Sequence, residues 1–147
     1  MSKELVVNKE VQINADVSKV WNALINPKLI KQYLFGTEAV SDWNMGSSII
    51  FRGKWEGKIY EDKGLILKLI TNKIFQYAFW SPFSGLEDKP ENYANITYEL
   101  IEKGGDTLLA VTQDNIKTDE MFNRIYENWE IILKGLKETV EKNVTSH

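Results

Sequence analysis

Side chains suited to catalysis and metal binding are scarce in this chain. It contains no cysteine, and its one histidine, His147, is the last residue. We therefore expect no thiol chemistry and no histidine-based metal site. Glu61–Asp62 and Asp119–Glu120 are interpreted as a solvated turn and a helix start, and no serine lies in a nucleophile motif. The sequence predicts no catalytic residue, no metal and no cofactor, although a carboxylate dyad assembled in space stays open.

The aromatic stretch KIFQYAFWSPFSG, which begins at Lys73, is the strongest candidate for a binding surface. Phe75, Tyr77 and Phe79 occupy alternate positions, so on a strand their rings share one face. Trp80 would then point to the opposite face. The stretch poses a choice between a filled core and the wall of a cavity, because aromatic residues serve both.

Other segments supply residues that would face the same interior. The predicted lining residues of a ligand cavity are Phe51, Phe75, Tyr77, Phe79, Tyr98 and Gln113 from strands, and Phe122, Tyr126, Trp129 and Leu133 from the C-terminal helix. Tyr77, Tyr98 and Gln113 would orient a ligand, since a buried hydroxyl or amide needs a partner. That partner is a neighbouring residue, water or a ligand, and the sequence leaves the three open.

Two further aromatic residues fall outside the predicted strands or at their ends. Trp55 lies in the turn RGKWEG, and Phe83 follows a proline in a predicted loop. We predict that both lie at the rim of the cavity or contact a partner. For Trp55, a ring folded over its own hairpin is an equal alternative.

Bulk properties restrict the class of protein. The chain has 147 residues and a formal net charge of -3, which is typical of one globular domain and argues against nucleic-acid binding. Its longest apolar run is far too short to span a membrane, and its N-terminus lacks the apolar core of a signal peptide. We expect a cytoplasmic protein without membrane insertion.

Hydropathy and turn residues predict the order of the elements. A strand over 5–13 precedes two short helices, the first capped by Asp16 and the second begun by Pro27. Six strands follow over 38–43, 48–52, 58–71, 73–80, 94–102 and 107–114, with turns between them. From Asp119 an apolar stripe of helical period continues to Val140.

This order predicts an α+β domain with a curved antiparallel sheet of about seven strands wrapped around a long C-terminal helix. Sequential hairpins make the sheet antiparallel, and the last helix is the only element long enough to cover it. We expect one domain over residues 1–147, with 143–147 as a frayed tail.

Several segments resemble the START-like, birch-allergen-like superfamily. They are INADVSKVWNALINP (13–27), GSSIIF (46–51), GLILKLITNKIFQYAF (64–79), DTLLAVTQ (106–113) and the Trp and Leu pattern from Trp129 to Leu136. More narrowly, they resemble the domain named after the activator of the heat-shock-protein-90 ATPase. Phe79 stands where that family often has tryptophan, and Thr71-Asn72 replaces its usual turn proline.

The resemblance implies a helix-grip fold with a hydrophobic cavity between the sheet and the long helix. Across the superfamily such cavities hold lipids, sterols or polyketides, and some members perform chemistry there. We therefore expect this protein to bind an apolar or amphipathic small molecule. Two alternatives stay open: a chaperone-linked adaptor that uses its surface, and a cyclase or hydrolase that acts in the cavity. A homodimer partner is also consistent with the sequence.

Overall fold

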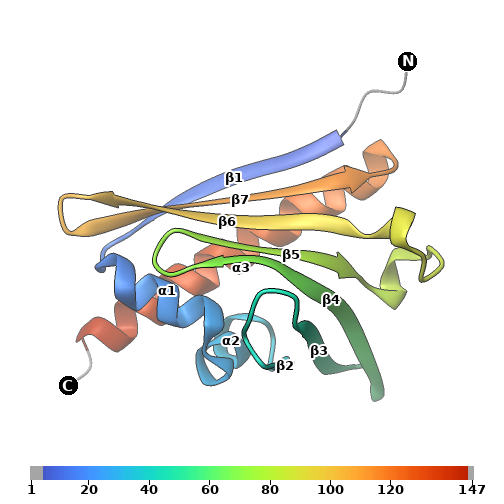
Figure 1. Cartoon of the computed structure of the whole chain (residues 1–147), viewed down its shortest axis with the longest axis horizontal. Coiled ribbons are helices and arrows are strands. Elements are labelled where there is room, and N and C mark those ends of the chain that lie inside the picture. Colours follow the sequence, from blue (N-terminus) through green and yellow to red (C-terminus); the bar gives the residue numbers. More distant parts are fainter. Residues whose placement is uncertain (1–4, 146–147) are drawn as a thin grey trace.

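A seven-stranded antiparallel sheet and one long helix form the body of the protein (Figure 1). The computed structural model describes residues 5–145, apart from the side chains of Trp55 and of 143–145. The strand order is β1-β7-β6-β5-β4-β3-β2. The strands are β1 (Leu5–Ile13), β2 (Glu38–Ser41), β3 (Ser48–Trp55), β4 (Lys58–Ile70), β5 (Ile74–Trp80), β6 (Ala94–Lys103) and β7 (Asp106–Ile116). The predicted α+β fold class is confirmed.

Two short helices follow β1 and begin where the sequence predicts. Helix α1 (Val17–Ile25) starts after Asp16, whose carboxylate accepts a hydrogen bond from the Lys19 backbone N–H at 3.1 Å. Helix α2 (Pro27–Tyr33) has proline in its first turn, and the Asn26 side chain accepts from the Lys28 N–H at 3.0 Å. These caps satisfy backbone donors that the first turn of a helix leaves unpaired.

Strand β3 extends further than the sequence predicts. Gly53, interpreted as a turn residue, lies inside the strand opposite Tyr60 of β4. A side chain at Gly53 would collide with the Tyr60 ring, so glycine is needed for the close approach of that ring. The hairpin turn falls instead at Glu56 and Gly57, both with positive φ.

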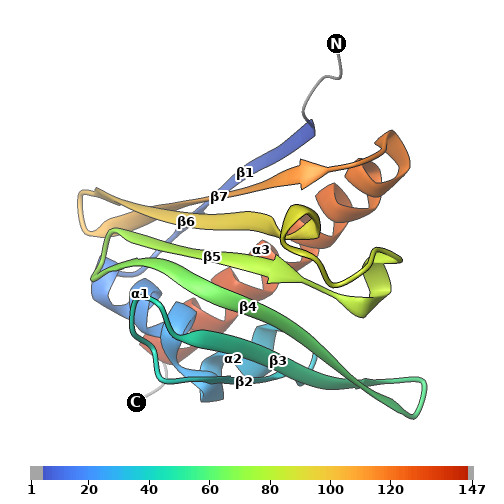
Figure 2. The ribbon, with the colours of Figure 1, turned by 45° about the vertical axis from the view of Figure 1, so that its right-hand side comes forward.

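The sheet curves, and β4 carries a bulge between Ile66 and Lys68 where its pairing with β5 shifts. Gly64 on the same strand lies so close to β5 that a Cβ would strike the Ala78 carbonyl. The long loop between β5 and β6 contains two short 3₁₀ helices, η1 (Pro82–Ser84) and η2 (Pro90–Asn92). Figure 2 shows this loop beside the end of β5, with the β3–β4 hairpin continuing past it.

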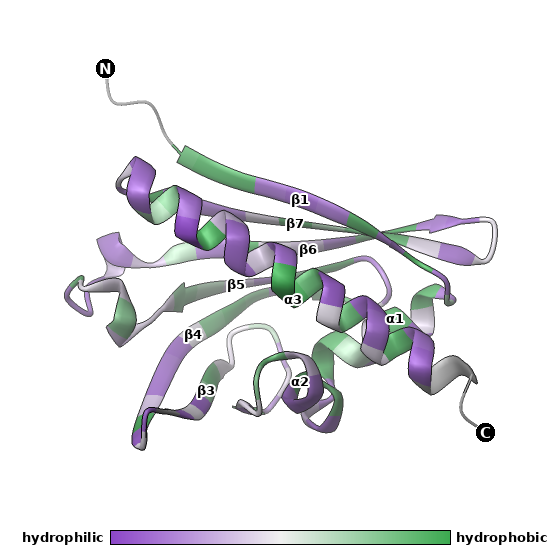
Figure 3. Cartoon of the chain, turned by 180° about the vertical axis from the view of Figure 1, so that it is seen from behind, coloured by the Kyte–Doolittle hydropathy of each residue, from purple (hydrophilic) through white to green (hydrophobic). Residues whose placement is uncertain are grey.

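Helix α3 (Asp119–Thr145) crosses one face of the sheet along its whole length (Figure 3). Its C-terminal half packs beside α1, α2 and β1, where Leu136 and Val140 are buried. The helix includes residues 143–145 of the expected tail, and 146–147 lie outside the described residues. Within the described chain, no helix has the length and hydropathy needed to cross a membrane.

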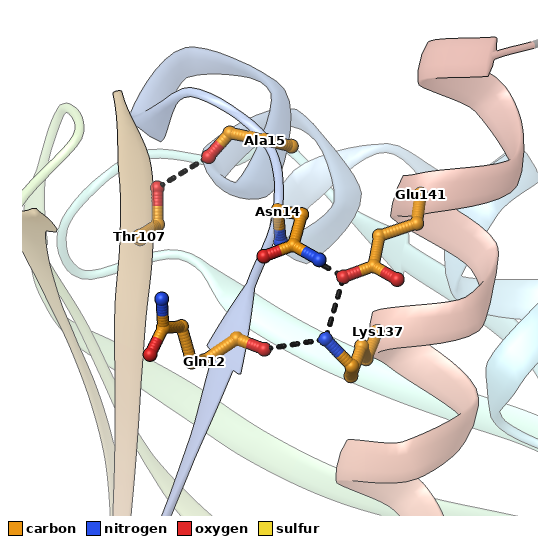
Figure 4. A network of polar contacts seen from close by, with 6 residues as sticks. All are labelled: Gln12, Asn14, Ala15, Thr107, Lys137 and Glu141. Carbon is orange, nitrogen blue, oxygen red and sulfur yellow. Dashed lines mark hydrogen bonds and ion pairs between the residues drawn. The ribbon is translucent and has the colours of Figure 1, made fainter. Parts of the chain in front are cut away.

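Polar contacts fasten the C-terminal half of α3 to the end of β1 (Figure 4). The Lys137 ammonium donates to the Gln12 carbonyl at 2.7 Å and pairs with Glu141 at 2.6 Å. Glu141 also accepts from the Asn14 backbone N–H at 2.8 Å. Here the helix, the end of β1 and the start of α1 form one packed unit.

Candidate functional site

A cavity of about 670 Å³ lies between the inner face of the sheet and the N-terminal half of α3. Strands β3 to β7 contribute one wall, and Met121, Ile125, Trp129 and Ile132 of α3 contribute the other. The inner face is apolar because alternate residues of each strand point inward, as the burial pattern of β6 shows. The volume is within the range of small-molecule pockets, about 300–1,000 Å³.

Three of the predicted aromatic residues form a continuous wall. The Phe51 ring centroid lies 5.7 Å from that of Tyr77 and 6.1 Å from that of Phe79. Tyr77 and Phe79 meet edge to face, with centroids 6.2 Å apart. Such tilted and edge-on contacts are the favoured geometry of aromatic pairs, so the three rings stabilise one another.

A second aromatic group lies where the cavity reaches the surface. Phe35 and Phe83 both line the cavity, although their side chains are 68% and 55% exposed. The Phe83 ring meets the Tyr60 ring edge to face, with centroids 5.0 Å apart. The Tyr60 hydroxyl lies 3.1 Å from the Thr37 hydroxyl, within hydrogen-bond distance. This contact holds the Tyr60 ring over Gly53, which has no side chain to obstruct it. Exposed apolar rings around an opening suit the entry of an apolar molecule.

The predicted polar residues lie deeper in the cavity. Gln113 accepts a hydrogen bond from the Trp129 indole N–H at 2.8 Å, so its amide oxygen already has a protein partner. Burial raises the pKa of the Tyr77 hydroxyl well above its usual value, and the neighbouring Tyr98, Tyr33 and Asp62 add to the rise. Burial likewise raises the pKa of Tyr98. Both phenols therefore stay protonated, and their hydroxyls share a hydrogen bond in which Tyr77 is the donor and Tyr98 the acceptor.

Asp62 is the unexpected member of the site. It was interpreted as part of a solvated turn, but it lies within β4, is half-buried and lines the cavity. Its Oδ1 atom is covered by protein and has no hydrogen-bond partner among the described residues. Burial raises the pKa of this carboxyl to about 6, and nearby Ser81, which favours the ionised form, offsets the rise only in part.

Asp62 is the only acidic side chain among the described residues that line the cavity, and Arg124 of α3 is the only basic one. No ion pair joins the two within the described chain. Arg124 is exposed on the first turns of the helix. The cavity is thus mainly apolar, with one half-buried carboxyl group that lacks a compensating charge.

Four predicted lining residues do not border this cavity. Phe75 and Leu133 are buried in the filled core, where Phe75 packs against Trp43 with ring centroids 6.2 Å apart. Phe122 and Tyr126 stack on each other at 6.0 Å, and the Lys9 ammonium lies 4.1 Å from the Tyr126 ring centroid. Phe122 and Tyr126 lie on the side of α3 that faces β1. The apolar stripe of the helix is wider than the part of it that borders the cavity.

The other six predicted lining residues border the cavity. They are Phe51, Tyr77, Phe79, Tyr98, Gln113 and Trp129. Phe83 lines the cavity and is exposed, whereas the Trp55 side chain lies outside the described part of the chain. The Trp80 ring lies beside Lys63, whose ammonium is 5.7 Å from the ring centroid on the outer face of the sheet. Trp80 also contributes to the cavity where β5 ends, and its indole N–H donates to the Leu86 carbonyl at 3.1 Å.

A signal for Asp62 was present in the sequence. Counting back by twos from buried Ile66 places Gly64, Asp62 and Tyr60 on the inner face of one long strand. The acidic pair Glu61–Asp62 suggested a solvated turn instead. In the structure only Glu61 faces outward, where it pairs with Arg52 at 3.0 Å.

Solved structures with the same fold come from several bacteria. The solution structure of ChR145 from Cytophaga hutchinsonii is 42% identical, covers 99% of this chain and 100% of that chain, and superposes with a TM-score of 0.84. Protein MLL2253 from Mesorhizobium loti is 19% identical over 97% of this chain and 100% of its own, with a TM-score of 0.79. The Aha1 dimer from Colwellia psychrerythraea is 21% identical over 93% and 96%, with a TM-score of 0.73.

Among curated proteins, none matches this chain. The family model described as activator of Hsp90 ATPase homolog 1-like protein matches residues 14–141, which include both helices after β1, the sheet from β2 onward and most of α3. The resemblance found in the sequence is therefore confirmed, and the protein belongs to the activator of Hsp90 ATPase homolog 1-like family.

Proposed function

We propose that this protein binds an apolar or amphipathic small molecule in the cavity between the sheet and α3. The observation that supports this most directly is the cavity of about 670 Å³, which has aromatic and aliphatic walls and opens between exposed Phe35 and Phe83. A domain core without such a role is close-packed and has few voids larger than a water molecule. A space of this size at one end of the domain is well suited to an organic ligand.

The polar groups in the cavity favour an amphipathic ligand over a purely hydrocarbon one. The Tyr98 hydroxyl can donate a hydrogen bond, and Asp62 offers an unpartnered acceptor oxygen. A few polar groups set in apolar walls usually fix the orientation of a ligand. Ligand binding would also stabilise the fold, because it favours the native state alone.

Native mass spectrometry of gently purified protein tests this proposal. We expect a co-purifying small molecule, or else saturable binding of the neutral dye N-phenyl-1-naphthylamine with a rise in its fluorescence. Ala94→Phe places a ring in the cavity and should abolish binding, whereas Glu99→Phe on the outer face of the same strand should not. Absence of both ligand and dye binding in the wild-type protein would contradict the proposal.

The adaptor function is the second candidate, because the family is named for an activator of the Hsp90 ATPase. It predicts saturable association with a heat-shock-protein-90-type chaperone that is lost on Trp55→Ala, even when the cavity is blocked by Ala94→Phe. Enzymatic action in the cavity, a homodimer and a cytoplasmic location stay predictions from the sequence.

A further inference from the structure

We propose that Asp62 anchors the ammonium group of an apolar amine, so that the cavity selects a cationic amphipathic ligand over neutral or anionic ones. This inference rests on the proposed binding function and adds the chemical class of the ligand. It follows from the position of one carboxyl group, from its one covered oxygen atom that accepts no hydrogen bond, and from the apolar side chains around it.

Asp62 lies on the inner face of β4, opposite Phe51 of β3 in the strand pairing. Its Oδ1 atom is covered by protein but accepts no hydrogen bond from the described residues. Among them it is the one buried side-chain nitrogen or oxygen left without a partner. Buried polar atoms are nearly always hydrogen-bonded, and exceptions occur at binding and catalytic sites.

The basic residues beside Asp62 on β3 and β4 pair with other carboxylates. Lys63 points to the outer face, where it pairs with Asp88, and Arg52 pairs with Glu61 at 3.0 Å. Arg124 lines the cavity but forms no ion pair with Asp62. Within the described chain, no cation neutralises the Asp62 carboxylate, so a ligand is the remaining source of positive charge.

Anionic, neutral and cationic ligands would interact with the Asp62 carboxylate in different ways. A carboxylate ligand would repel Asp62, and a hydrocarbon would cover it without offering a donor. An ammonium group would donate a charge-assisted hydrogen bond to Oδ1. The faces of Phe51 and Tyr77 belong to the same wall and would attract a cation as well.

Competition between matched ligands tests the inference. Decylamine, 1-decanol and decanoate share a chain and differ in the head group, and each would displace N-phenyl-1-naphthylamine at pH 7.5. We expect decylamine to compete about tenfold more strongly than 1-decanol, and decanoate to be weakest. In Asp62→Asn the advantage of the amine should disappear. It should persist in Glu61→Gln, which removes the adjacent, outward carboxylate.

The pH dependence of the competition between amine and alcohol provides a second test. The advantage of the amine should decline as the pH falls through about 6, the pKa of the Asp62 carboxyl in the free protein. The other charged or titratable groups facing the cavity are Tyr60, Tyr77, Tyr98 and Arg124. Phenol and guanidinium groups do not change charge in this range.

The outcomes separate the two proposals. If the dye binds but amine and alcohol compete equally, the assignment of Asp62 is wrong while small-molecule binding stands. An equal amine advantage in Asp62→Asn would also overturn it. If wild-type protein binds neither dye nor any of the three competitors in calorimetry, small-molecule binding fails and this inference fails with it.

Discussion

The two halves of helix α3 pack against the rest of the protein in different ways. The C-terminal half lies beside α1, α2 and the end of β1, and its buried residues Leu136 and Val140 are 0% and 3% exposed. The N-terminal half faces the curved strands β3 to β7 across the cavity. Where two short helices fill the space under the sheet, the core is closed. Where the sheet curves away from one helix alone, it stays open.

Polar contacts differ between the halves in the same sense. At the closed end, Lys137, Glu141 and Thr107 join backbone groups of β1 and of the turn before α1, with Thr107 donating to the Ala15 carbonyl at 2.9 Å. At the open end, Asp62 lacks a partner for one buried oxygen. The polar groups of the closed end thus hydrogen-bond within the protein, whereas the open end leaves one acceptor oxygen unused.

The largest predicted effect comes from removing a side chain at the closed end. Leu136→Ala should lower the free energy of unfolding by about 3 kcal/mol, because the site is fully packed and cannot collapse around the void. Ile125→Ala, at a residue of the same helix that borders the cavity, should cost about 1 kcal/mol. Urea denaturation measures both, and equal costs would contradict the contrast between the halves.

Adding side-chain volume should also affect the two ends differently, with the larger loss of stability at the closed end. Ala23→Leu in α1 inserts methylene groups where the alanine is 0% exposed, and should destabilise the protein by about 2 kcal/mol. Ala94→Leu points into the cavity and should change stability by less than about 1 kcal/mol. Thermal unfolding followed by circular dichroism checks this pair. Similar losses in the two variants would mean that the cavity end is packed as tightly as the other.

Replacing the unpartnered carboxyl should stabilise the open end. The pKa of Asp62 is about 6 in the folded protein, above its ordinary 3.8, so between these values the folded state binds more protons than the unfolded state. Stability therefore falls as the pH rises from about 4 to beyond 6. Asp62→Asn removes this loss and should be more stable than wild type by about 1–2 kcal/mol at pH 7.5.

Urea titrations of the two proteins across this pH range provide the measurement. The difference should vanish near pH 3.5, where the wild-type carboxyl is protonated in both states. A constant difference at every pH would show that ionisation of Asp62 is not its cause.

The smallest effect on stability is expected at the mouth. Phe35 is 68% exposed and has a φ of 56°, a conformation that asparagine tolerates better than other residues with a side chain. Phe35→Asn should leave the free energy of unfolding within about 0.5 kcal/mol of wild type. The affinity for N-phenyl-1-naphthylamine should fall several-fold, because an apolar ring at the entrance is lost. Met45→Asn, at another exposed position away from the cavity, should leave dye binding unchanged.

Local signals in the sequence were sufficient for the order and type of the elements. Asp16 and Pro27 mark the starts of two helices, and alternation along β5 and β6 marks inward faces, because these features depend on backbone geometry near each residue. Six of the ten predicted lining residues border the cavity for the same reason. Gly53 was misassigned as a turn because its role, the close approach of Tyr60, involves a residue on another strand.

Only the tertiary structure decided where the interior is filled and where it is hollow. Phe75 and Tyr77 are two residues apart on one face of β5, yet one packs in the core and the other borders the cavity. The difference between them depends on the curvature of the sheet and on the positions of α1 and α2. Both are determined by many contacts between residues that are far apart in the sequence. The environment of Asp62 was decided in the same way, since a carboxyl in a strand becomes half-buried, with one oxygen left unpaired, only when other elements pack around it.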